Sequence, residues 1–128
     1  MEIVRRGIEA LNRGDLDSFC QGLGPEIKWE EMPSLGPDAA AYTGVTSVRG
    51  ALESWLGMWT DYEAVAHRCV DAGDNVVILF TERGRGRESG VAVEREMGIV
   101  HTFRSGKVIH SRLFGNWNEA LKAAGSSN

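Results

Sequence analysis

Apolar residues at the start of the chain recur at the spacing of an amphipathic helix. One face of that helix would carry Ile3, Val4, Ile8 and Leu11. The run NRGDLDSF then interrupts the pattern at Gly14, and Asp15 is a residue type that favours the N-cap of a new helix. The sequence therefore predicts two short helices in succession.

A third helix is predicted further along the chain. Thr46 or Ser47 can cap it, and apolar residues follow at helical spacing in Val48, Leu52, Trp55 and Trp59. The preceding run EIKWEEM has the pattern of a strand, and PSLGPDAAAYTG is rich in the residues of loops. The apolar stripe of the helix must pack on another element.

The second half of the chain is predicted to be mostly strand. Its strand-like segments are residues 61–71, 75–88, 91–104 and 107–115, separated by turn residues in AGDN, ESG and RSG. A short helix, NWNEALKAAG, ends the predicted domain at residue 125, and residues 126–128 are predicted to be a disordered tail. Helices first and long strands afterwards predict one α+β domain over residues 1–125, with helices packed on one face of a strongly curved antiparallel sheet.

The arginine-glycine stretch TERGRGRESG permits two interpretations. Such repeats bind RNA when they form long disordered tracts. Here a two-residue turn at residues 89–90 would instead place Arg85 opposite Glu94 and Arg83 opposite Glu96, so that opposite charges pair across a hairpin. Because the net charge is −4 and the pI is near 5.4, we favour the hairpin and expect no nucleic-acid partner.

The same register assigns side chains to the two faces of the sheet. Alternation places on the helix-covered face Val76, Ile78, Phe80, Glu82, Met97, Ile99, His101 and Phe103. A second two-residue turn at residues 105–106 would set His101 opposite His110 and Ile99 opposite Arg112. The predicted inner face is therefore apolar and carries a few ionisable groups.

Composition excludes several classes of function. Cys20 and Cys69 lie far apart and form no CxxC pair, so the sequence supports neither a zinc site nor a disulfide. Two histidines with a carboxylate could hold a metal, but their spacing is not that of a known site, and we expect no metal and no organic cofactor. No run of roughly 18 apolar residues and no signal-peptide pattern is present, so we expect a cytoplasmic protein without membrane contact.

Several stretches along the chain carry a family resemblance: ALNRGDLDSF, PEIKWEE, YTGVTSVRG, VDAGDNVVIL, GRGRESGV, FRSGKVIHSRLF and EALKAAG. Together they resemble the SnoaL-like polyketide cyclase group of the nuclear transport factor 2-like superfamily. The resemblance spans essentially the whole chain and implies a cystatin-like cone of helices over a strongly bent sheet. It says little about the reaction, because the superfamily includes isomerases, cyclases, dehydratases, epoxide hydrolases and non-catalytic binding proteins.

The resemblance extends to the ketosteroid isomerases, whose functional residues can be carried over position by position. Their general base corresponds to Glu31 in KWEEMP, whereas their two oxyanion-hole donors correspond to Gly7 and Ile99, which have no donor side chain. The loss of one such donor costs about a hundredfold or more in rate, so steroid isomerisation is not expected. The acidic residue that cyclases carry late in the last strand has no counterpart in HSRLF.

Each candidate residue has a functional and a structural interpretation. In the functional interpretation Glu31 is a general base beside aromatic residues, and in the structural one it is a solvated residue at the end of a strand. His101 forms an acid–base pair with His110 in the first interpretation and is part of the core in the second. The residues predicted to line a ligand pocket are Trp29, Tyr42, Trp55, Trp59, Phe80, Glu82, Met97, Ile99, Phe103 and Arg112. In most proteins such aromatic residues are core, but the implied fold has a cavity within its core.

The leading hypothesis is an apolar pocket in which a hydrophobic small molecule undergoes isomerisation, cyclisation or dehydration by proton transfer. Glu31 or the His101–His110 pair would take the proton, and Arg112 or Tyr42 would stabilise the developing charge. The alternative is a non-catalytic protein of the same fold that binds a small molecule or serves as a dimeric partner.

The face of the sheet turned away from the helices is also predicted to be apolar. It would carry Val77, Leu79, Val100 and Thr102. An apolar face needs a cover, and we expect a second copy of the chain, in a homodimer, to supply it.

Overall fold

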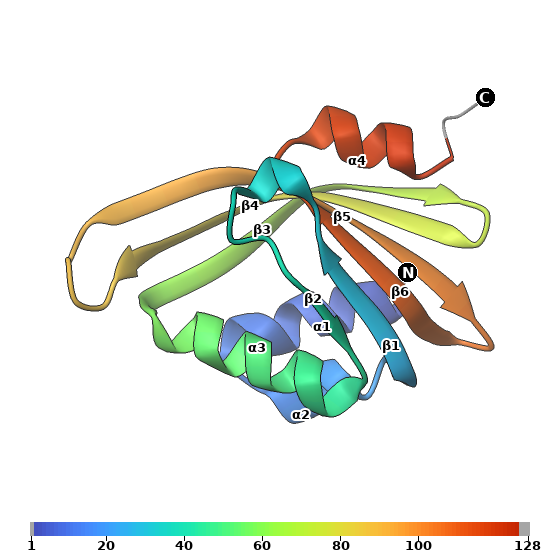
Figure 1. Cartoon of the computed structure of the whole chain (residues 1–128), viewed down its shortest axis with the longest axis horizontal. Helices are drawn as coiled ribbons and strands as arrows, with labels where there is room; N and C mark the ends of the chain where they lie inside the picture. The colour runs from blue at the N-terminus through green and yellow to red at the C-terminus, as the bar shows by residue number, and fades with distance from the viewer. Residues whose placement is uncertain (1, 126–128) are drawn as a thin grey trace.

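The computed structural model of the chain describes residues 2–125, in which three helices lie under a bent sheet and a fourth lies above it (Figure 1). The helices are α1 (Glu2–Arg13), α2 (Leu16–Cys20), α3 (Val45–Gly57) and α4 (Trp117–Ala123), with a 3-10 turn η1 (Pro33–Leu35). The strands are β1 (Leu23–Glu31), β2 (Ala41–Thr43), β3 (Trp59–Ala72), β4 (Asn75–Gly86), β5 (Ala92–Arg104) and β6 (Lys107–Phe114). They form one sheet in the order β2-β1-β6-β5-β4-β3. The predicted tail, residues 126–128, lies outside the described residues.

The helices begin and end largely for local reasons. Asp15 caps α2 as predicted, because its carboxylate accepts a hydrogen bond from the backbone N–H of Ser18 at 3.1 Å. The start of α3 differs from the prediction: the N-cap is Gly44, with φ 90°, and neither Thr46 nor Ser47 caps the helix. Trp59, predicted on the face of α3, is the first residue of β3.

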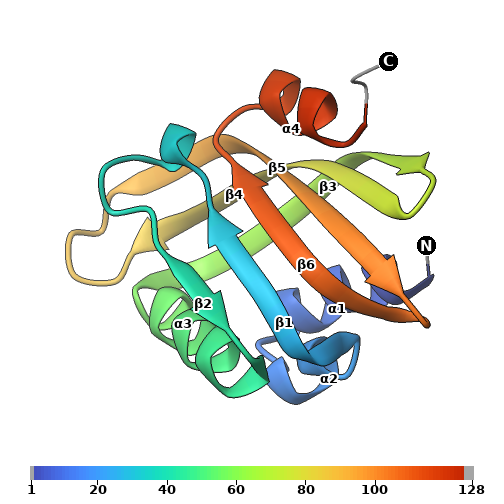
Figure 2. The same cartoon turned by 45° about the vertical axis from the view of Figure 1, so that its right-hand side comes forward.

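The sheet was predicted to be purely antiparallel, but it is mixed. Within residues 2–125, β1 runs parallel to β6, with Trp29 opposite Ser111, while the other neighbouring strands are antiparallel (Figure 2). The loop-like run PSLGPDAAAYTG contains β2, in which Tyr42 pairs with Trp29. No short turn joins β1 to β6, so local sequence does not fix their relative direction.

The β4–β5 hairpin has a longer loop than predicted. Its end is closed by hydrogen bonds from the N–H of Gly86 to the carbonyl of Val91 at 3.0 Å and from the N–H of Gly90 to the carbonyl of Gly86 at 2.8 Å. The register therefore moves by two residues, and Arg83 lies opposite Glu94. A shift of two residues leaves every side chain on its predicted face, because the side-chain period of a strand is two.

The β5–β6 hairpin contains a bulge that changes the predicted faces. Phe103 lies opposite Val108 as predicted, but the register shifts between Thr102 and Phe103. Beyond the bulge His101 lies opposite Ser111, and the predicted pairing of His101 with His110 is wrong. The one-residue shift turns His110 and Arg112 to the face of the sheet opposite His101.

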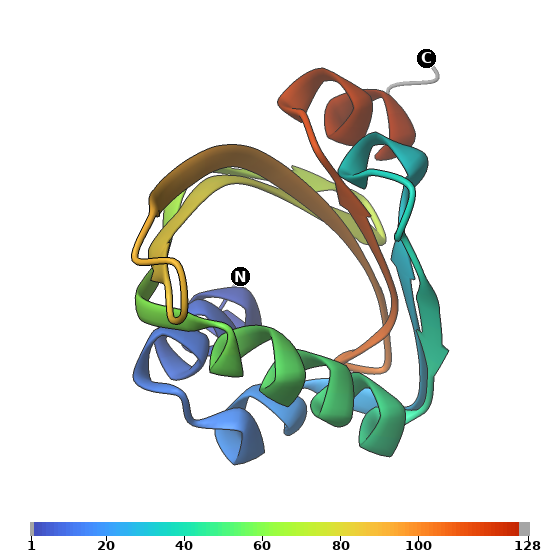
Figure 3. The same cartoon turned by 60° about the vertical axis from the view of Figure 1, so that its left-hand side comes forward.

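The core has two layers, one on each face of the sheet. Figure 3 shows the elements that cover these faces, three helices under the arch and α4 outside it. The inner layer, under the arch of the sheet, contains Val4, Ile27, Trp29, Val48, Ile78 and Ile99. The outer layer lies under α4 and contains Val77, Leu79, Val100, Phe114, Ala120 and Ala124. The apolar outer face that we expected a second copy to cover is thus covered by α4 of the same chain.

Candidate functional site

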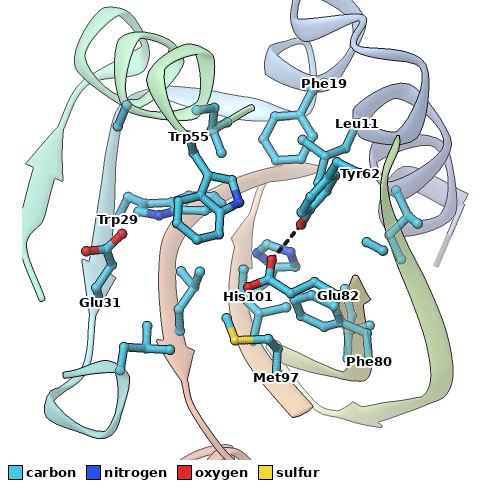
Figure 4. Close-up of a pocket in the computed structure, with 18 of the residues that line it drawn as sticks. Leu11, Phe19, Trp29, Glu31, Trp55, Tyr62, Phe80, Glu82, Met97 and His101 are labelled. Atoms are coloured by element: carbon cyan, nitrogen blue, oxygen red, sulfur yellow. Dashed lines mark hydrogen bonds between the residues drawn. The ribbon is translucent and has the colours of Figure 1, made fainter. Parts of the chain in front are cut away.

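A cavity of about 120 Å³ lies between the helices α1–α3 and the concave face of the sheet (Figure 4). Its walls are mostly apolar and include Phe19, Trp29, Trp55, Phe80, Met97 and Ile99. The cavity lies where the bent sheet arches over the helices α1–α3. Figure 3 shows this arch with the helices beneath it. Such a concave apolar space with a few polar groups is the usual form of a small-molecule site.

Glu82 brings a carboxylate into this apolar space. The residue is 6% exposed, and its two oxygens each accept a hydrogen bond. The hydroxyl of Tyr62 donates to Oε1 at 2.7 Å (Figure 4). Nε of Arg95 donates to Oε2 at 2.5 Å. Hydrogen bonds to an ionised group are short and strong, so this carboxylate is held in one orientation.

A local distortion of β3 aims Tyr62 at Glu82. The β3–β4 register shifts between Thr60 and Glu63, and the intervening Asp61 has a left-handed φ of 56°. Gly84 faces this bulge, and a Cβ there would lie 3.4 Å from the Cα of Tyr62. Bulges re-aim side chains in this way, so the glycine leaves space for the bulge, and the bulge directs the phenol ring.

Burial keeps the phenol of Tyr62 protonated. The low-dielectric surroundings raise its pKa far above the usual value, and the neighbouring charge and hydrogen bond of Glu82 act in the same direction. Tyr62 is therefore a hydrogen-bond donor at neutral pH.

Arg95 closes one side of the cavity. Its guanidinium carbon lies 5.3 Å from the ring centroid of Trp55, a cation–π contact, and its side chain is 41% exposed. Trp55 also packs edge-on against Trp59 at 5.3 Å between centroids. Trp59 itself lines a much smaller neighbouring space together with Val93, not the main cavity.

His101 lies deeper in the cavity wall. Its Nδ1 is 2.8 Å from Oγ of Ser111, and its ring packs edge-on against Phe103 at 6.4 Å. Burial lowers the pKa of the imidazole to about 4, because no nearby charge compensates for desolvation of the cationic form. At neutral pH His101 is therefore uncharged and offers hydrogen bonds rather than charge.

Glu31 reaches the cavity from the opposite wall. Its Oε1 accepts a hydrogen bond from the backbone N–H of Ala40 at 3.0 Å, and the residue is half-buried. Sequence alone left open which way this side chain points, since Glu30 and Glu31 face opposite sides of β1. Glu30 takes the outer side, where it contacts Nε2 of His110 at 2.6 Å.

The predicted pocket residues divide between the cavity and other places. Those that line the cavity are Trp29, Trp55, Phe80, Glu82, Met97 and Ile99, together with Glu31 and His101. Tyr42 and Phe103 pack against the inner core without lining the cavity. Arg112 lies on the outer face, where Nη2 donates to the carbonyl of Ala123 at 3.4 Å, so it cannot stabilise charge in the cavity.

Within residues 2–125, Tyr62 is one of two polar residues of the cavity wall that were not predicted from the sequence, the other being Arg95. The position of Tyr62 depends on the β3 bulge, which has no clear sequence signature beyond Gly84. Arg95 could have been predicted as a cavity residue from the pairing of β4 with β5, because it lies directly opposite Glu82 once the hairpin register is corrected.

Within residues 2–125, no three His, Cys, Asp or Glu side chains gather closely enough to hold a metal ion. None of the helices in that range is long and apolar enough to cross a membrane.

Comparison with known proteins relates this architecture to a family and to solved structures. A family model described as the SnoaL-like domain matches residues 4–111. Comparison with curated proteins returns no match. An NTF2-like protein from Burkholderia thailandensis is 26% identical, with 99% of this chain and 95% of that chain covered and a TM-score of 0.79.

Two other solved structures have the same fold at lower identity. A candidate SnoaL-like polyketide cyclase from Jannaschia sp. is 19% identical, with 98% and 90% of the two chains covered and a TM-score of 0.78. A hypothetical protein from Catenulispora acidiphila with a ketosteroid isomerase-like fold, in complex with trimethylamine, is 16% identical, with 97% and 92% covered and a TM-score of 0.79. The predicted α+β fold class is thereby confirmed.

Proposed function

This chain belongs to the SnoaL-like domain family, as its motifs predicted, and we propose that it binds a hydrophobic small molecule in the cavity and catalyses a cofactor-free proton transfer on it. The observation that carries the proposal is the carboxylate of Glu82, 6% exposed in an apolar space and oriented by Tyr62 and Arg95. A fixed carboxylate at such a place is suited to act as a general base.

The proposed step is the removal of a proton from carbon next to a carbonyl group. The C–H bond breaks, the proton passes to a carboxylate oxygen of Glu82, and the electron pair moves to the carbonyl oxygen as an enolate. The guanidinium of Arg95, which is bound to Glu82, stabilises the negative charge on the enolate oxygen. Return of the proton at another carbon gives an isomer. Attack of the enolate carbon on a second carbonyl of the same molecule, whose oxygen takes the proton from Glu82, gives cyclisation, and loss of a β-hydroxyl as water with that proton gives dehydration.

Glu31 and His101 have secondary parts in the proposal. Glu31 faces the ligand from the opposite wall and can return a proton to a different carbon. His101, neutral at pH 7 because burial lowers its pKa to about 4, holds a polar group of the ligand by a hydrogen bond. This assignment replaces the His101–His110 pair, since His110 lies on the outer face with Glu30.

The trimethylamine complex of the Catenulispora protein supports the binding of small molecules by proteins of this fold. The rival proposal is a non-catalytic binding protein, which would need the apolar walls but no proton acceptor. Exchange of ligand hydrogen for deuterium separates the two, because it detects proton removal without knowledge of the product.

The experiment incubates cyclohexanone and related ring ketones with the protein in D₂O and follows deuterium at the α-carbon by NMR. Catalysed exchange should fall by about a hundredfold or more in Glu82→Gln, the usual contribution of a general base. Glu63→Gln, an exposed carboxylate of β3, is the matched control and should keep full activity. Binding of the ketones without exchange above the buffer rate would favour the non-catalytic alternative.

We keep two expectations from the sequence as proposals. The homodimer rests on the family resemblance alone, because α4 covers the face that first suggested it. Sedimentation equilibrium at micromolar concentration tests it, with a mass of 14.0 kDa for the single chain as the contrary result. A cytoplasmic location likewise remains an expectation, which fractionation of the source cells tests.

A further inference from the structure

We infer that the ligand of this cavity is a neutral compound with a single ring and a hydroxyl or ketone group at one end. The inference rests on the proposed function and narrows it, because it follows from the size, the charge and the polarity of the same cavity.

Size limits the ligand to about one ring. The cavity has a volume of about 120 Å³. An engineered cavity of roughly 150 Å³ in another protein binds benzene. The walls on the sheet side are fixed: Ala64, Met97 and Ile99 are buried in the middle of long strands. Close-packed interiors resist expansion, so a compound of three or four fused rings does not fit without displacing these side chains.

Charge favours a neutral ligand. The titratable groups on the cavity wall are Glu31, Tyr62, Glu82, Arg95 and His101. Glu82 and Arg95 compensate each other at 2.5 Å, while Tyr62 and His101 are uncharged at pH 7. An anionic ligand would meet two carboxylates and one guanidinium, and a cation beside Glu82 would have to displace Arg95 from Glu82 and Trp55. Glu31, on the opposite wall, already accepts a hydrogen bond from the backbone N–H of Ala40. A buried charge without a partner is costly, so neutral compounds are favoured.

The strongest cluster of polar groups places a hydrogen-bonding group at one end of the ligand, since Glu31 and His101 elsewhere on the wall already have partners in Ala40 and Ser111. Tyr62 and Glu82 lie together on one side of the cavity, and Trp29 lies across from them (Figure 4). Arg95 is on the side of Glu82, to which it is hydrogen-bonded. Each oxygen of Glu82 accepts one hydrogen bond and can accept another from a ligand hydroxyl. Arg95 binds Glu82 through Nε, and its terminal nitrogens carry further N–H donors for a ligand carbonyl.

Titration with a set of probes tests the inference. The probes are 4-methylphenol, toluene, benzoate, benzylammonium and 9-phenanthrol, measured by calorimetry with the fluorescence of Trp55 and Trp29 as a second readout. We expect 4-methylphenol to bind at least ~tenfold more tightly than each of the other four. A tenfold difference in affinity is the size of effect expected when a ligand is too large for its site or leaves one polar group unpaired.

A pair of variants on α3 shows whether binding occurs in the cavity. Ala51 lines it, so Ala51→Leu should weaken 4-methylphenol binding by ~tenfold. Ser54 is exposed on the same helix, so Ser54→Leu should leave binding unchanged. Thermal melts of both variants check that each is folded.

The contrary outcomes are distinct. Tighter binding of 9-phenanthrol, lost in Ala51→Leu, would overturn the size limit and leave the proposed function standing. Tighter binding of benzoate or benzylammonium would overturn the neutral ligand, and equal binding of toluene would overturn the polar end. If no probe binds, or if Ala51→Leu has no effect, the cavity is not the binding site and the proposed function fails as well.

Discussion

Nδ1 of His101 lies 2.8 Å from Oγ of Ser111, and the two residues meet because a bulge displaces β6 by one residue against β5. Without the bulge His101 would face His110, and the cavity wall would carry two imidazoles. With it, one buried imidazole is bonded to a hydroxyl, and the other lies on the far face of the sheet beside Glu30. A one-residue shift thus decides which chemistry the cavity contains.

The free energy of unfolding should decrease as the pH is lowered through the range in which His101 titrates. Burial lowers its pKa in the folded protein from 6.5 to about 4, so the unfolded chain binds its proton first. The contribution of His101 is complete above about pH 6.5 and is lost as the pH falls towards 4, at up to about 1.4 kcal/mol per pH unit. Urea unfolding between pH 4 and 7 measures this slope.

The slope should become smaller in His101→Gln, which cannot titrate. His67→Gln removes an exposed histidine and is the matched control. An unchanged slope in His101→Gln would contradict the assignment.

Loss of the Tyr62 hydroxyl should destabilise the fold. In Tyr62→Phe the buried carboxylate of Glu82 loses one of its two donors, and hydrogen bonds to charged groups contribute about 1.5–3 kcal/mol. Tyr42→Phe is the comparison, because within residues 2–125 its hydroxyl has no hydrogen-bond partner, and it should cost much less. Equal free energies of unfolding for the two variants would show that the Tyr62–Glu82 bond is not stabilising.

The contact of α4 with the sheet should depend on Gly98. A Cβ at this position would lie 2.5 Å from Cβ of Ala120, so Gly98→Ala must push α4 away from the sheet, at a cost of about 1–3 kcal/mol. In the Ala120→Gly background the same substitution should cost less, although Ala120→Gly itself weakens the helix by about 1 kcal/mol. Purely additive losses in this double-mutant cycle would mean that the two positions do not clash.

The β5–β6 turn should tolerate asparagine better than serine. Ser105 has φ 54° and Gly106 has φ 79°, so both turn residues are left-handed, a geometry that favours Asn-Gly. Ser105→Asn is expected to raise the free energy of unfolding by up to about 1 kcal/mol, and Ser105→Val to lower it by about 1–2 kcal/mol. The order of the urea midpoints checks this, and a valine variant as stable as the wild type would contradict it.

Much of the fold was determined by the sequence itself. The period of two along β4 and β5 placed Ile78, Phe80, Glu82, Met97 and Ile99 on the inner face. That placement survived a two-residue error in the hairpin register, because a shift of two residues moves no side chain to the other face. Side-chain alternation and helical spacing are local properties, so they can be read without knowledge of the partners.

Tertiary structure alone decided the polar part of the site and the cover of the outer face. Tyr62 points at Glu82, and His110 and Arg112 point away from the cavity, because of bulges in β3 and β6. A bulge inserts one residue between long-range partners, and which residue it is depends on how the whole strand packs rather than on its own sequence. In the same way α4 covers Val77, Leu79 and Val100 because the chain returns across the sheet, which no local pattern specifies.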